Sequence, residues 1–121
     1  MRDKQVPREE WSDFFQQFSL RHADSSATVR VLNPRFGCQV EMHELPLGGI
    51  VADRRGRGPI SIFAGRAPEK NVEHDIEDPI QVWVELSDAG VEEALDIESQ
   101  DGTRTLVIFR PETVDDVLRR A

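Results

Sequence analysis

Residues 95–109 (LDIESQDGTRTLVIF) constrain the fold most strongly, because two alternating apolar segments flank a tight-turn sequence. A two-residue hairpin loop needs a positive φ at both central positions, which Asp101 and Gly102 tolerate. This stretch therefore predicts a hairpin of known register. The expected pairs are Gln100 with Thr103, Ile97 with Leu106, Leu95 with Ile108, and Asp96 with Val107.

That register divides the hairpin into an apolar face and a second, more polar face. Val107 and Phe109 fall on the second face, where water would cover them in a bare sheet. Strand parity places Phe63 and Trp83 on second faces in the same way. The hairpin therefore predicts another layer that covers these four side chains.

An amphipathic helix over residues 7–22 can supply that layer. Its aromatic residues Trp11, Phe14, Phe15 and Phe18 recur at i, i+3, i+4 and i+7, which is one helical stripe. Burying a phenylalanine contributes about 1.5–3 kcal/mol, so the stripe favours packing on the sheet. The alternative is a stripe exposed for binding a partner, since aromatic residues also suit recognition.

From residue 27 onward the apolar period changes to two, which indicates strands. Short turn-forming breaks separate them, including one at Pro46, and short connections favour antiparallel neighbours. The expected strands are 27–33, 37–45, 48–54, 59–64, 71–77, 79–86, 91–99 and 103–110.

The final segment, 111–120, places Val114, Val117 and Leu118 on one helical face and predicts a short terminal helix. We therefore expect a single α+β domain over residues 1–121. It consists of a curved antiparallel β-meander or small barrel of six to eight strands, over about 27–110, with the N-terminal helix packed on it.

Composition restricts the partners and the compartment. A formal net charge of -8 disfavours nucleic acid and anionic membranes, which attract basic surfaces. No apolar run approaches the ~18 residues that span a bilayer. The start of the chain, MRDKQVPREE, lacks the apolar segment of a signal peptide. We expect a cytoplasmic protein with no nucleic-acid or membrane partner.

Motifs that carry chemistry are not apparent. Cys38 and His43 are five residues apart, which puts them on opposite faces of a regular strand, so we expect Cys38 to be a buried, inert thiol. The histidines show no metal-ligand spacing, and no phosphate-loop, dinucleotide or nucleophile-elbow motif occurs. We therefore expect no catalytic residue, metal or cofactor.

Two candidate binding sites remain. Arg54, Arg55 and Arg57 form a cationic loop that can hold a phosphate, a nucleotide or an acidic partner, although the favoured explanation is a solvated hairpin loop, since charged loop tips are common. A pocket inside the curved sheet, near Met42, would be lined by a second set of residues. These are His43, His74 and Trp83.

Three stretches together resemble a known family. They are Trp11, Phe14 and Phe18 with Ser19; GCQVEMHELPLGGIVAD at 37–53; and LDIESQDGTRTLVIF at 95–109. In these the chain is similar to small bacterial proteins of the domain-of-unknown-function 5335 family, from about residue 7 to residue 109. The resemblance implies a single-domain bacterial protein, and it transfers no catalytic residue.

The function that these observations favour is a non-enzymatic binding or protein-interaction module. The first alternative is a small enzyme or ligand-binding barrel with a pocket near His43, His74 and Trp83. The second is anion or nucleotide binding at the loop 54–57. A protein partner, or homodimerisation through an uncovered edge strand, is compatible with each of them.

Overall fold

The computed structural model describes residues 2–66 and 71–109. One α-helix and eight strands occur in these ranges, and the expected helix at 111–120 lies outside them. The elements are β1 (Arg2–Val6), a 3-10 turn η1 (Arg8–Glu10), α1 (Trp11–Arg21), β2 (Ser26–Asn33), β3 (Gly37–Val51), β4 (Ile60–Ala64), β5 (Val72–Ile76), β6 (Pro79–Leu86), β7 (Glu92–Ser99) and β8 (Arg104–Ile108).

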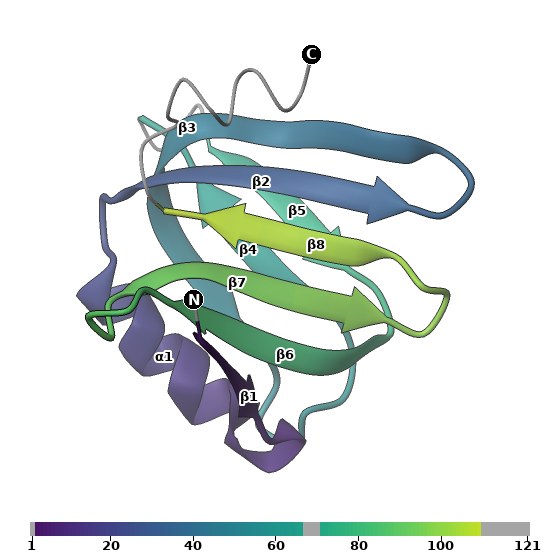
Figure 1. Cartoon of the computed structure of the whole chain (residues 1–121), viewed down its shortest axis with the longest axis horizontal. Helices are drawn as coiled ribbons and strands as arrows, with labels where there is room; N and C mark the ends of the chain where they lie inside the picture. Colours follow the sequence, from purple (N-terminus) through teal and green to yellow (C-terminus); the bar gives the residue numbers. More distant parts are fainter. Residues whose placement is uncertain (1, 67–70, 110–121) are drawn as a thin grey trace.

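All eight strands form one antiparallel sheet in the order β1-β6-β7-β8-β2-β3-β4-β5. The sheet curves so strongly that β4 and β5 lie behind the other strands, with α1 at one end (Figure 1). The expectation of a curved antiparallel sheet with one packed helix is confirmed. The sheet does not close into a barrel, because β1 and β5 remain its two ends. It is also not a simple meander, since β1 pairs with β6 and β2 with β8.

The long strand β3 connects the two layers of the curved sheet. Its first part, from Gly37 to Pro46, pairs with β2, and its last part, from Leu47 to Val51, pairs with β4. The predicted break at Pro46 is wrong, because this residue lies within the strand, where its carbonyl accepts a hydrogen bond from the Gly65 N–H. Instead of a break, β3 has a positive φ at Glu44. Its pairing with β4 also shifts in register between Leu47 and Gly49.

The register predicted for the last hairpin is wrong by one residue. The Ser99 N–H donates to the Thr103 carbonyl, so the loop has three residues, and of these only Gly102 has a positive φ. A three-residue loop of this kind ends in a glycine bulge. The observed pairs are Leu95 with Val107, Ile97 with Thr105, and Asp96 with Leu106.

This shift moves Val107 from the second face of the hairpin to the face of Leu95, which is the concave face, and there it is completely buried. The aromatic stripe of α1 packs on that same face. Trp11, Phe15 and Phe18 belong to one core with strand residues such as Leu95. The prediction that the stripe packs on the sheet is confirmed, but the face was assigned wrongly.

The helix therefore leaves two of the expected aromatic residues uncovered. Phe63 and Trp83 alternate with buried core residues of β4 and β6, so they point to the outer, convex side of the sheet. Phe109 is the exception, since its ring lies 5.2 Å from the ring of Phe18. None of the helices in the described ranges is long and apolar enough to cross a membrane.

We predict that F15A lowers the free energy of unfolding by about 3–5 kcal/mol, because Phe15 is fully buried between the helix and the sheet. Leu20, on the same helix, is 70% exposed, so L20A is the matched control and should cost less than about 0.5 kcal/mol. Urea unfolding of both variants measures the difference. Equal stabilities would show that α1 does not belong to the core.

Candidate functional site

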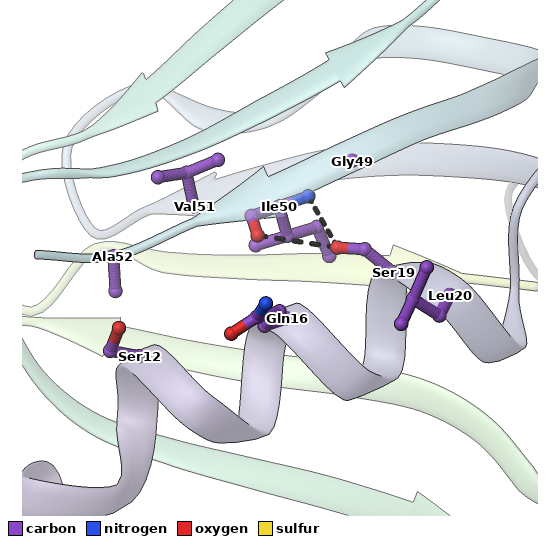
Figure 2. A pocket seen from close by; sticks show the side chains of 8 residues that line it. All are labelled: Ser12, Gln16, Ser19, Leu20, Gly49, Ile50, Val51 and Ala52. Carbon is purple, nitrogen blue, oxygen red and sulfur yellow. Dashed lines mark hydrogen bonds between the residues drawn. The ribbon is translucent and has the colours of Figure 1, made fainter. Parts of the chain in front are cut away.

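A groove runs between α1 and the end of β3, with a volume of about 390 Å³ (Figure 2). One wall comes from the helix and the other from the backbone and side chains of the strand. Its lining consists of Ser12, Gln16, Ser19, Leu20, Gly49, Ile50, Val51 and Ala52. The helical residues lie about one turn apart, which places them on one side of α1.

Ser19 fastens the helix to the strand. This end of β3 pairs with β4 along one edge, and its other edge faces α1. The Ile50 N–H donates to Ser19 Oγ at 2.9 Å, and Ser19 Oγ lies 3.3 Å from the Ile50 carbonyl oxygen and 2.7 Å from that of Phe15. One hydroxyl thus replaces a neighbouring strand for Ile50, and it holds the two walls at a fixed separation.

Gly49 keeps the middle of the groove open. A Cβ built at this position would have Ser19 Oγ, at 3.9 Å, as its nearest neighbour, so a larger side chain would extend into the groove without a backbone clash. The hydrogen side chain of Gly49 therefore determines the depth of the site.

Much of the groove surface is apolar. Leu20 is 70% exposed and Val51 is 56% exposed, and both belong to its lining. Ser12 and Gln16 add a hydroxyl and an amide on the helical wall. Among the described residues, none of the side chains that line the groove is ionisable.

The cationic loop predicted from Arg54, Arg55 and Arg57 begins directly after this wall, because Asp53 follows Ala52. Asp53 Oδ1 accepts the Arg55 N–H at 2.6 Å and the Arg57 N–H at 3.2 Å, which fixes the loop backbone. The three arginines are exposed.

Arg8 holds the far side of that loop. Its Nη1 donates to the Gly56 carbonyl at 2.5 Å and its Nη2 to the Pro79 carbonyl at 3.1 Å. Gly56 has a φ of +68°, and a Cβ there would lie 2.5 Å from Arg8 Cγ, so only glycine fits. Arg57 lines a separate polar hollow with Arg8.

The structure does not bring His43, His74 and Trp83 together. His43 is exposed on β3, 3.8 Å from Glu44. His74 is half-buried on β5, beside a small polar hollow with Ser99 and other residues. Trp83 lies on the convex side of β6. The concave side, where a shared pocket was expected, is occupied by buried apolar side chains, Met42 among them.

The expected buried thiol at Cys38 is wrong, because this residue is exposed. The first five residues of β3 are all exposed, and among the described strands they pair only with β2. Within the described residues, no group of three or more histidine, cysteine, aspartate or glutamate side chains is arranged to hold a metal ion.

A cluster at the other end of α1 was not found from the sequence. Arg21 donates to both carboxylate oxygens of Glu92, at 3.1 and 3.0 Å, and His22 Nε2 lies 2.9 Å from Oε1. The His22 ring packs between Phe18 and Phe109, with centroids 4.3 and 4.9 Å away. These partners are about 70 residues apart in sequence, so only the fold brings them together.

The same cluster shifts the acidity of Glu92. Burial alone would raise the pKa of this carboxyl, but the hydrogen bonds and charges of Arg21 and His22 outweigh it, so the pKa lies below its ordinary value. The ionised carboxylate therefore stabilises the contact between the end of α1 and β7.

We predict that S19A lowers the free energy of unfolding by about 1–3 kcal/mol, because the Ile50 N–H loses its partner in a partly buried place. Ser12 lines the same groove, and S12A is the control, with an expected change below about 0.5 kcal/mol. Urea denaturation compares the two variants. An S19A protein as stable as S12A would contradict a structural role for this hydroxyl.

We also predict that E92Q costs about 1 kcal/mol at pH 7, a modest value because solvent screens the partly exposed carboxylate. A lowered folded-state pKa stabilises above the unfolded value of about 4.3, and that stabilisation is lost as the pH falls through the folded pKa. Thermal unfolding from pH 7 to pH 3 should therefore show the two proteins converging at low pH. The exposed Glu41 provides the control variant, E41Q. A stability difference between the unmodified protein and E92Q that stays constant with pH, or that is no larger than the difference for E41Q, would contradict the prediction.

Together the described residues define a class: an α+β fold whose helix α1 packs on the concave face of an open antiparallel sheet and borders an apolar groove. The chain belongs to the family of unknown function DUF5335, whose model matches residues 2–117, so the resemblance seen in the sequence is confirmed. It is 25% identical over 111 residues to an uncharacterised protein of Aquifex aeolicus (strain VF5), covering 92% of this chain and 95% of that protein. No solved structure matches the chain.

Proposed function

We propose that this protein is a non-enzymatic binding module whose ligand inserts an apolar chain into the groove between α1 and β3. The observation that carries the proposal is the exposure of Leu20 and Val51, two large apolar side chains, on one groove that no described ionisable side chain lines. Exposed apolar surface that gathers in a concave site commonly marks ligand binding.

The ligand that fits best is an amphiphilic anion with a short apolar chain. Arg54 and Arg55 follow Ala52 by two and three residues, so the exposed cationic loop directly follows the strand wall of the groove in the chain. On a chain with a net charge of -8, such a loop is a local exception that attracts a carboxylate or a phosphate. This unites the binding module with the anion site expected at the loop 54–57.

The size of the groove supports a small ligand. Its volume of about 390 Å³ is at the lower end of the range of about 300–1,000 Å³ for ligand pockets. Ser12 and Gln16 can bond a polar atom along the chain, whereas the strand wall offers only apolar side chains and backbone.

Titration with decanoate, followed by amide NMR, tests the groove. We predict saturable shifts at Ser19, Gly49 and Val51, and at least a tenfold loss of affinity, about 1.4 kcal/mol, in G49L, whose side chain fills the site. V72L on the edge strand β5 enlarges an exposed side chain outside the groove lining, although by one carbon where G49L adds four, and is the control. Unchanged affinity in G49L, or shifts confined to other residues, would overturn the proposal.

A second arm of the titration separates the charged end from the apolar one. The double variant R54A/R55A should weaken decanoate about tenfold, as expected for a lost charge-assisted contact, and leave decanol unaffected. Decanol binding equal to decanoate in the unmodified protein would reject the anionic head group and leave the groove as the binding site.

A further inference from the structure

The convex side of the sheet has a hollow of its own, with a volume of about 350 Å³. Four strands contribute to it, and all of its residues lie on the face opposite to α1 and its groove. They are Asp3 from β1, Trp83 from β6, Asp96 and Glu98 from β7, and Arg104 from β8. This site is separate from the one described above.

Strand register places an indole among carboxylates. Trp83 pairs with Asp96 on one side and with Gln5 on the other, so Asp3 and Glu98 are its diagonal neighbours on the same face. The indole N–H donates to Gln81 Oε1 at 3.3 Å, and the side chain remains half-exposed. A tryptophan in this position presents a ring that the helix does not cover.

The cationic side chain that lines the hollow, Arg104, forms an ion pair with Asp96. Arg104 binds Asp96 through two contacts, Nη2 to Oδ2 and, at 3.3 Å, Nε to Oδ1. Asp96 is only 8% exposed, and its charge raises the pKa of Arg104 above its ordinary value. This pair is therefore held in place, and its charges cancel.

Within the described residues Asp3 and Glu98 form no close ion pair, although Glu98 lies opposite Arg104 in the register of β7 and β8 and its charge contributes to the raised pKa of Arg104. No described lysine or arginine lies over the Trp83 ring. The other tryptophan differs, because the Arg8 guanidinium lies over Trp11, 4.5 Å from the ring centroid. Three carboxylates and one guanidinium leave the hollow with two net negative charges.

We propose that this hollow binds an organic cation, an ammonium or a guanidinium group, over the face of Trp83 and between Asp3 and Glu98. Aromatic rings attract cations through their quadrupole, most strongly in tryptophan. Asp3 and Glu98 supply the opposite charge, and the net charge of -8 attracts cations from a distance. The group can belong to a free amine or to a lysine or arginine of a basic partner.

Tryptophan fluorescence tests the site directly. Trp11 is 1% exposed, so Trp83 provides the response to an added ligand. Butylammonium and butylguanidinium should change the emission saturably, whereas the neutral butanol should not. We predict that D3N and E98Q each weaken binding at least fivefold, and that D13N, which removes an exposed carboxylate from α1, leaves it unchanged.

Two further experiments identify the source of the cation and check that a loss of binding is not a loss of folding. A short peptide with two lysines that binds at least tenfold more tightly than butylammonium points to a basic protein partner, and equal affinity points to a free amine. W83F should weaken binding while thermal unfolding shows that the fold is kept. Equal responses to butylammonium and butanol, or affinities that D3N and E98Q do not change, would overturn the proposal.

Discussion

The contact on which the rest of this structure depends is the packing of one aromatic helical stripe on the concave face of an open sheet. An antiparallel sheet that curves without closing leaves an apolar hollow, which would otherwise fill with water. Trp11, Phe15 and Phe18 occupy it, and each is almost completely buried. Their burial determines where α1 lies, and the position of α1 creates the groove.

The groove exists because a side-chain hydroxyl, and not a neighbouring strand, is the hydrogen-bond partner at this edge of β3. Where β3 turns away from β2, its edge needs a new hydrogen-bonding partner, and the hydroxyl of Ser19 takes that part for Ile50. A side chain fills less space than a strand does. The remaining space, lined by Leu20 and Val51, is the candidate binding site, so the site arises from how the sheet edge is satisfied.

The helix and strands were easier to predict from the sequence than the side of the sheet on which each side chain lies. The helical stripe and most of the alternating strands are local patterns and were predicted correctly, but β1 was missed and β3 was divided at Pro46. The loop of the last hairpin was read one residue too short, and because strand side chains alternate, this shift reversed the face of Val107. The groove and the contacts of Glu92 could not be predicted, since they join residues far apart in the chain through packing that no local pattern encodes.

Native-state hydrogen exchange at the Ile50 amide tests the central claim most directly, that α1 and the edge of β3 form one cooperative unit with the core. Amides open either locally or with the whole domain, and the free energies of opening distinguish these cases. The account predicts that Ile50 and the amides of α1 exchange with the same free energy as the central strand β7. Exchange of α1 and Ile50 at a much lower free energy, with β7 still protected, would contradict it.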